Sequence, residues 1–132
     1  MVYDKQQLVQ YRISRAKETI DEAHLVLEKD RLNLAANRIY YAGYYIVSAL
    51  ALQQGFSTSK HYQLMGWFNK EFVKSGRVPK EMGRIFLNAF ETRQEGDYED
   101  MISFDKELLK DKLKQMEVFV DSVEKLILSD KS

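Results

Sequence analysis

The chain of 132 residues contains no cysteine, one proline and six glycines. Without cysteine, disulfides and thiolate metal sites are excluded, and a reducing compartment is compatible with the sequence. Two histidines are too few for a histidine-rich metal site, so we expect no metal and no cofactor. Because helix breakers are few and fall between periodic segments, most of the chain is free to form helices.

The sequence also lacks an excess of charge of either sign. Twenty basic and twenty acidic side chains give a formal net charge of zero. This balance argues against a dedicated nucleic-acid coat or a membrane-surface protein, although a local basic pocket remains compatible with it. The first residues contain no apolar signal segment, and the longest apolar stretch, 39–52, is shorter than a spanning helix. We therefore expect a cytoplasmic protein with no membrane contact.

The length and the apolar periodicity predict the fold. A chain of 132 residues is typical of one domain, so we expect residues 1–132 to share a single core. The pattern predicts five helices, over about 4–29, 32–54, 60–74, 79–96 and 105–128. Asp4, Pro79 and Asp105 are suited to begin three of them, and Gly55 to end the second. The predicted fold is an all-α, up-and-down bundle of about five helices.

Three apolar patterns predict which helix faces are buried. The first helix has apolar residues at steps of three to five: Leu8, Tyr11, Ala16, Ile20, Ala23 and Leu27. The last helix has an a/d seam formed by Leu109, Leu113, Met116, Val120, Val123 and Ile127. The second helix is apolar on nearly all sides, which predicts that other helices and a partner subunit together cover it.

The second helix contains one conspicuous charge, Arg38. A guanidinium in a buried helix requires an anion or several acceptors. One interpretation is a structural ion pair with Glu91, Glu95 or Asp97. The alternative is a phosphate-binding site, because arginine binds phosphate bidentately.

Two further segments are candidates for a ligand site. Lys60 and His61 begin the third predicted helix, and a helix N-terminus with cations nearby favours anions; a solvated histidine is the alternative. Arg93 and Asp97 are four residues apart, so they meet on one helix turn as a surface ion pair or at the edge of a cleft. We expect His24 at the surface or at an interface.

Four tyrosines fall within six positions of the second predicted helix: Tyr40, Tyr41, Tyr44 and Tyr45. They are interpreted as core and dimer contacts, and stacking on single-stranded bases is the alternative if the rings are exposed. The chain contains no GxGxxG, P-loop or GxSxG motif, and no Glu-x-x-His pair typical of a carboxylate metal site in a four-helix bundle.

Four segments together resemble a HEPN domain of the small bacterial and archaeal UPF0332 type. They are 37–42 (NRIYYA), Gly55 with 59–61 (SKH), 76–79 (GRVP) and 93–98 (RQEGDY). Their order and separations agree with the family over roughly residues 10–125. The resemblance implies an all-α bundle that dimerises and works with a minimal nucleotidyltransferase, often as a toxin–antitoxin pair.

The resemblance also implies a reaction. Many HEPN proteins are metal-independent ribonucleases with an R-x(4–6)-H motif, in which the ribose 2′-hydroxyl attacks the adjacent phosphate. The histidine transfers protons and the arginine stabilises the anionic phosphorus centre. Arg93 matches that arginine, but Tyr98 stands five positions later and no histidine follows Arg93. Asp100 occupies the position of a tyrosine that the partner enzyme adenylylates in some family toxins.

The sequence leaves three functions open. The first is a non-catalytic or weakly active homodimer whose polar cleft binds a nucleotide, RNA or a partner through Arg38, Lys60, His61, Arg93, Asp97 and Tyr98. The second is a ribonuclease toxin in which Arg93 acts with Tyr98 or with His61, provided that His61 approaches Arg93 across a pocket or a dimer seam. The third is a structural adaptor without a ligand site. The missing histidine favours the first.

Overall fold

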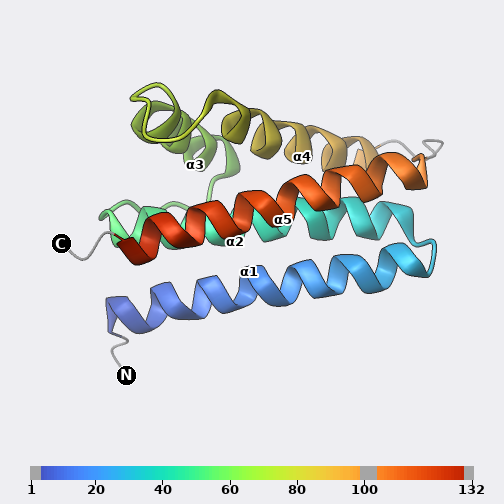
Figure 1. Cartoon of the computed structure of the whole chain (residues 1–132), viewed down its shortest axis with the longest axis horizontal. Helices are drawn as coiled ribbons and strands as arrows, with labels where there is room; N and C mark the ends of the chain where they lie inside the picture. The colour runs from blue at the N-terminus through green and yellow to red at the C-terminus, as the bar shows by residue number, and fades with distance from the viewer. Residues whose placement is uncertain (1–3, 99–103, 130–132) are drawn as a thin grey trace.

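A computed structural model describes residues 4–98 and 104–129, and within these ranges it contains helices and no strand (Figure 1). The helices are α1 (Lys5–Glu28), α2 (Leu32–Gln53), α3 (His61–Phe68), the π-helical turn η1 (Asn69–Val73), α4 (Lys80–Tyr98) and α5 (Lys106–Ser129). The predicted all-α bundle is confirmed, and each predicted helix is present. The predicted third helix differs in one respect, because its last turn is π-helical.

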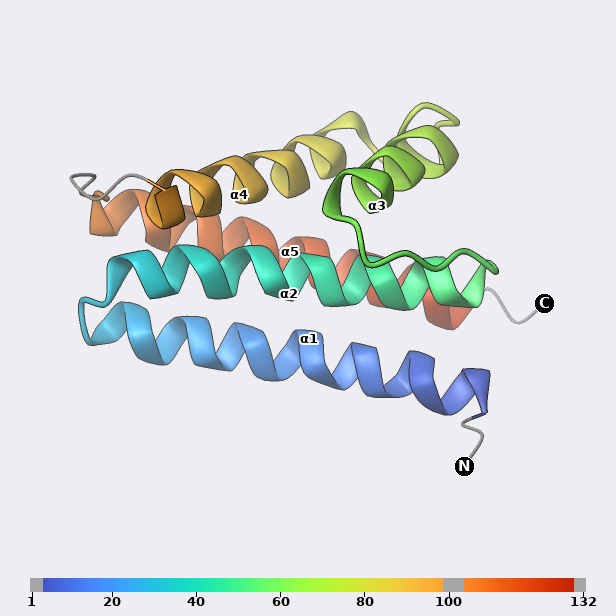
Figure 2. The same ribbon diagram turned by 180° about the vertical axis from the view of Figure 1, so that it is seen from behind.

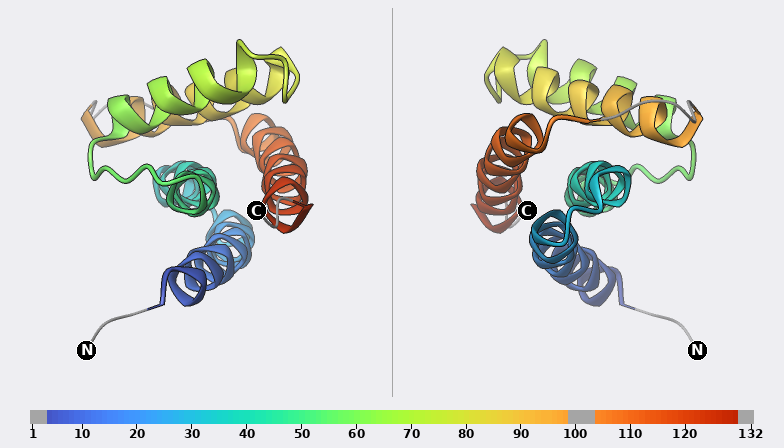
Figure 3. Two further views of the ribbon diagram at one scale, coloured as in Figure 1. Left: turned by 90° about the vertical axis from the view of Figure 1, so that its left-hand side faces the viewer. Right: turned by 90° about the vertical axis from the view of Figure 1, so that its right-hand side faces the viewer.

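The second helix is the centre of the bundle. Helix α2 packs against α1, α3, α4 and α5. Viewed from the ends of the bundle, α1 lies on one side of α2, α5 on another, and α3 with α4 forms a layer across the top (Figure 3). In Figure 2, α2 lies between α1 and the α3–α4 layer, with α5 behind it. Neighbouring helices therefore cover α2 on three sides.

Local hydrogen bonds explain where the helices begin and end. The Asp4 carboxylate accepts from the Gln6 N–H at 3.1 Å and the Asp105 carboxylate accepts from the Glu107 N–H at 3.0 Å, as N-caps do. The tight turn after α1 places Asp30 at a positive φ of 61°, and Gly55 follows α2 with a φ of 86°. Asp4, Asp105 and Gly55 thus lie at the helix ends that the sequence predicts.

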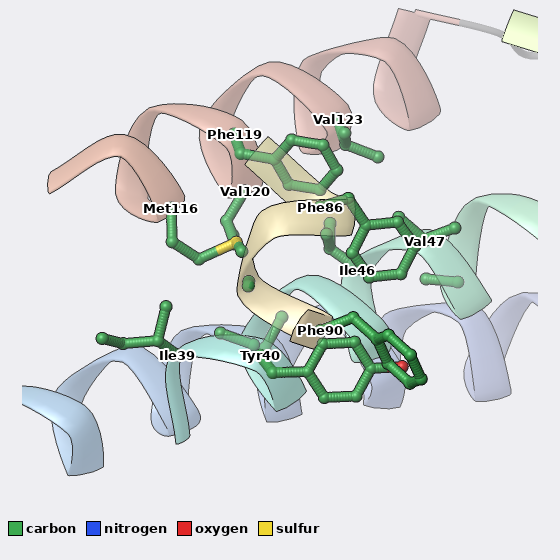
Figure 4. Close-up of a cluster of buried hydrophobic side chains, with 14 of the residues drawn as sticks. Ile39, Tyr40, Ile46, Val47, Phe86, Phe90, Met116, Phe119, Val120 and Val123 are labelled. Carbon is green, nitrogen blue, oxygen red and sulfur yellow. The ribbon is translucent and has the colours of Figure 1, made fainter. Parts of the chain in front are cut away.

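The core forms where α2 meets α4 and α5, and Figure 4 shows the apolar side chains of the three helices gathered there. The rings of Phe86 and Phe119 stack with centroids 5.8 Å apart. A Cβ atom on Gly43 would lie 2.9 Å from Met116 Cε and 3.2 Å from Phe86 Cδ1, so a glycine allows the three helices to approach closely. The buried part of α2 is thus a close-packed core.

The predicted core faces are confirmed for the last helix and partly wrong for the first. All six residues of the predicted a/d seam of α5 are buried. Helix α1 instead buries a rotated set, Val9, Ile13, Ala16, Thr19, Ala23 and Leu27. Tyr11 is 61% exposed, because the step of five from Tyr11 to Ala16 leaves the face that steps of three and four define. No helix in the described part of the chain is long and apolar enough to cross a membrane.

Candidate functional site

The centre of the candidate site is Tyr40, whose side chain is fully buried. Its ring stacks on Phe86 with centroids 5.8 Å apart and meets Phe90 edge-on at 5.4 Å. Its hydroxyl lies 2.6 Å from His61 Nδ1. Burial raises the pKa of Tyr40 far above its usual value, so the group remains a neutral phenol.

His61, the first residue of α3, lies against the tyrosines of α2. Its ring centroid is 5.5 Å from that of Tyr40, 6.0 Å from Tyr41 and 5.0 Å from Tyr44. Partial burial and then the positive charge of Arg93 lower the pKa of His61 below its ordinary value of about 6.5. The imidazole is therefore neutral at pH 7.

Arg93 reaches the same tyrosines from α4. Its guanidinium carbon lies 5.6 Å from the ring centroid of Tyr40 and 5.3 Å from that of Tyr41, within cation–π range. Nε forms an ion pair with Asp97 Oδ2 at 2.9 Å. The geometry does not qualify as a hydrogen bond, so the buried Nε has charge compensation but no hydrogen-bond acceptor in the described part of the chain. The Arg93 side chain is 16% exposed.

Arg93 and His61 therefore flank the same two rings, Tyr40 and Tyr41, within a single chain. The ribonuclease alternative required that His61 approach Arg93 across a pocket or a dimer seam. The structure brings the two side chains together because α3 and α4 lie in one layer over α2 (Figure 2). The site needs no second subunit for this juxtaposition.

Arg38 lies at the edge of this group, and its predicted partners are wrong. Its guanidinium forms an ion pair with Glu22 of α1 at 3.1 Å, and its Nε and Nη2 donate to Asn37 Oδ1. Glu91, Glu95 and Asp97 lie on α4, whereas this side of α2 faces α1. The Arg38 guanidinium also covers the ring of Tyr41 at 5.4 Å. Arg38 is thus a structural ion pair at the margin of the site.

The other predicted residues are placed as follows. Lys60 is exposed, and its backbone N–H donates to Thr58 Oγ1 at 3.1 Å just before α3. Asp97 is bound to Arg93. Tyr98 is the last residue of α4, and its side chain lies outside the described part of the chain, as does all of Asp100. His24 is exposed and bonds Glu117 of α5, so the predicted surface position is confirmed.

Helix α4 continues two residues beyond its predicted end at about residue 96, to Tyr98. A Cβ atom on Gly96 would lie 2.9 Å from Phe104 Cε2, and the Gly96 carbonyl accepts from Asn33 Nδ2 at 3.5 Å. The glycine permits close contact with the segment before α5. Arg93 and Asp97 therefore project from a continuous helix, which holds them in fixed register.

Two arginines of α1 were missed. Arg12 Nη1 donates to the Ser48 carbonyl at 3.1 Å, and the Arg15 guanidinium carbon lies 5.0 Å from the Tyr45 ring centroid. Both flank the half-buried tyrosines of α2. Burial raises the pKa of Tyr44, and the charge of Arg12 opposes this rise. Arg12 and Arg15 are three residues apart, and this spacing could have indicated that both lie on one face of the helix.

The site is a partly exposed surface and lies apart from a cavity formed by α3, η1 and α4. The cavity has a volume of about 650 Å³, and its lining includes Lys74, Lys80 and Arg84. None of the predicted site residues lines it. Among residues 4–98 and 104–129, no group of three histidine, aspartate or glutamate side chains is placed to hold a metal ion. The chemistry available at the site comes from Arg93, His61 and the tyrosine rings.

Comparisons with known proteins identify the family of the chain. Residues 9–126 match the family model of the HEPN domain. The chain is 46% identical over 124 residues to a "UPF0332 protein" of Thermotoga maritima, which covers 94% of both chains. It is 27% identical over 117 residues to "Putative toxin MJ0142" of Methanocaldococcus jannaschii, covering 89% of this chain and 80% of that protein. The chain therefore belongs to the HEPN domain family.

Proposed function

We propose that the group formed by Arg93, His61, Tyr40 and Tyr41 binds the phosphate of an RNA or a nucleotide. The observation that carries this proposal is that a guanidinium and a neutral imidazole lie against the same two rings. Arginine grips phosphate oxygens with its planar fork, and an imidazole N–H adds a further donor. The site would thus hold an anion without a metal.

Half-buried tyrosines beside this group are suited to the base of such a ligand. Tyr41 and Tyr45 are partly exposed, and arginines lie over both rings. Aromatic side chains and arginine planes together bind single-stranded nucleic acid through stacking and charge. An RNA strand is therefore favoured over an isolated inorganic anion.

The proposed biological setting is a toxin–antitoxin-like system. Membership of the HEPN family and the similarity to a protein named as a toxin support this setting. In it, the chain would form a homodimer and associate with a minimal nucleotidyltransferase.

Binding of a fluorescein-labelled single-stranded RNA, followed by fluorescence anisotropy, tests the proposal. Arg93→Ala should weaken binding about ten- to hundredfold, because a charge-assisted hydrogen bond contributes roughly 1.5–3 kcal/mol. Arg84→Ala is the matched control, since Arg84 is an exposed arginine of the same helix. Equal weakening by both substitutions, or no binding by the unsubstituted protein, would contradict the proposal.

The position of His61 beside Arg93 favours one second candidate, a metal-independent ribonuclease. In that reaction the ribose 2′-oxygen bonds to phosphorus and the bond to the 5′-oxygen breaks, which leaves a 2′,3′-cyclic phosphate. The proton of the 2′-hydroxyl leaves through a base, and the 5′-oxygen gains a proton. This candidate, unlike the binding proposal, predicts RNA cleavage in the presence of EDTA that His61→Ala abolishes. Unchanged cleavage would remove His61 from the mechanism.

A further inference from the structure

The contact between Tyr40 and His61 joins the core to the site. Tyr40 is fully buried in the aromatic cluster of α2 and α4, and His61 is partly exposed at the first turn of α3. The hydroxyl of Tyr40 and His61 Nδ1 are 2.6 Å apart. A short hydrogen bond thus ties the one histidine near Arg93 to a side chain that core packing holds in place.

The direction of this bond follows from the partners available. A buried phenol is a donor that must find an acceptor, because leaving it unpaired has a high free-energy cost. Among the residues that the structure describes, His61 Nδ1 is the acceptor within reach of the Tyr40 hydroxyl. A neutral imidazole carries its proton on one nitrogen only, so an accepting Nδ1 leaves the proton on Nε2.

We propose that Tyr40 is a positioning residue that holds His61 in the Nε2–H tautomer, so that His61 presents a hydrogen-bond donor to a phosphate bound at Arg93. The phosphate ligand in this inference depends on the proposed function, whereas the tautomer of His61 does not. The bond also fixes the orientation of the ring, which three tyrosines surround.

This tautomer has a consequence for the chemistry of the site. An Nε2 that carries a proton has its lone pair delocalised in the ring, so it donates to a phosphate oxygen but does not accept the proton of a ribose hydroxyl. For His61 to act as a base through Nε2, its proton would have to move to Nδ1, and the Tyr40 hydroxyl would lose its acceptor. Tyr40 therefore favours binding over cleavage at this site.

The groups around His61 favour the same neutral donor. The titratable and charged side chains that face it are Tyr40, Tyr41 and Tyr44 of α2 and Arg93 of α4. Partial burial and, after it, the charge of Arg93 disfavour an imidazolium. A bond donated by Tyr40 stabilises the neutral ring further, because it occupies the lone pair that a proton would take.

Long-range ¹H–¹⁵N NMR of the uniformly labelled, unsubstituted protein tests the tautomer directly. The chain has two histidines, and His24, which bonds Glu117 of α5, serves as the internal reference. We expect His61 to show a protonated Nε2 and an accepting Nδ1 at neutral pH. A protonated Nδ1 would overturn the proposal, whatever the protein binds.

Two matched variants test the cause. Tyr40→Phe keeps the buried ring and removes the hydroxyl, so the titration midpoint of His61 should move to higher pH and its Nδ1 signal should shift. Tyr44→Phe keeps the ring 5.0 Å from His61 and removes a hydroxyl that does not bond it, so both signals should stay in place. Equal responses to the two variants, or none to Tyr40→Phe, would overturn the role of Tyr40.

Binding of the labelled RNA separates this inference from the proposed function. Tyr40→Phe should weaken binding by about two- to tenfold, as expected for a donor that is no longer held in place. If the unsubstituted protein shows the Nε2–H tautomer but no RNA binding, the proposed function fails and the role of Tyr40 remains. If RNA binds but His61 carries its proton on Nδ1, the proposed role of Tyr40 is wrong and the proposed function stands.

Discussion

The two sides of α2 differ in what they pack against. The side toward α4 and α5 carries Gly43 and meets the apolar side chains of Phe86 and Met116. Another side carries Arg38 and Tyr41, which remain partly exposed and make polar or cation–π contacts with Glu22 of α1 and Arg93 of α4. One helix thus supplies both a core that fixes the fold and a surface able to bind a ligand.

Tyr40 belongs to both sides, because its ring stacks on Phe86 in the core and its hydroxyl meets His61 at the site. A change in the core should therefore disturb the site, whereas a change at the margin of the site should leave the core intact. The following predictions test this asymmetry.

The largest expected effect comes from the core. Phe86→Ala should lower the free energy of unfolding by about 3–5 kcal/mol, because it removes a buried ring and leaves a cavity beside Tyr40 and Phe119. Urea denaturation followed by circular dichroism measures the change. Leu87→Ala, at the adjacent and 48% exposed position, is the control and should cost much less. Similar losses in both variants would contradict the packing described for α4.

A smaller effect is expected from the pH dependence of stability. The pKa of His61 is lower in the folded chain than its ordinary value of about 6.5, so the unfolded chain binds the proton more tightly. The stability that His61 contributes is complete above about pH 6.5 and decreases as the pH falls through that value. His61→Gln should therefore lose less stability than the unsubstituted protein between about pH 7.5 and 5.5. Urea midpoints at the two pH values measure the difference, and equal losses would show that His61 does not titrate as described.

The smallest effect is expected at the margin of the site. Glu22→Gln removes the charge that pairs with Arg38, and both side chains are partly exposed, at 45% and 23%. We expect a loss of less than about 1 kcal/mol in the free energy of unfolding, because solvent screens such pairs. RNA affinity should change little, since the Arg38 pair is structural. A large loss of RNA affinity would show that Arg38 is part of the binding site and not of its margin.

Much of the fold could be predicted because it depends on local patterns. The a/d seam of α5, the caps at Asp4 and Asp105 and the end of α2 near Gly55 follow from side chains close in sequence. The buried face of α1 was partly misplaced, because Tyr11 is large and apolar enough to resemble a core residue yet lies off the face. Periodicity identifies a helix more reliably than it identifies its rotation.

The site could be predicted only in part, because it depends on contacts between distant segments. The residue types of Arg93 and His61 indicated an anion site, but their common contact with Tyr40 and Tyr41 depends on how α3 and α4 lie over α2. The pairing of Arg38 with Glu22 could not be predicted either, because the two residues lie on different helices, 16 positions apart in the sequence. The spacing of residues in sequence does not show which helices face each other.

A double-mutant cycle on Arg93 and His61 tests most directly whether the two side chains form one phosphate site. Binding of labelled single-stranded RNA is measured for the unsubstituted protein, for Arg93→Ala, for His61→Ala and for the double variant. If both side chains hold the same phosphate, the double variant should lose less binding free energy than the two single variants lose together. The difference, the coupling energy, should be about 0.5–3 kcal/mol. Losses that add with no coupling would show that Arg93 and His61 act separately.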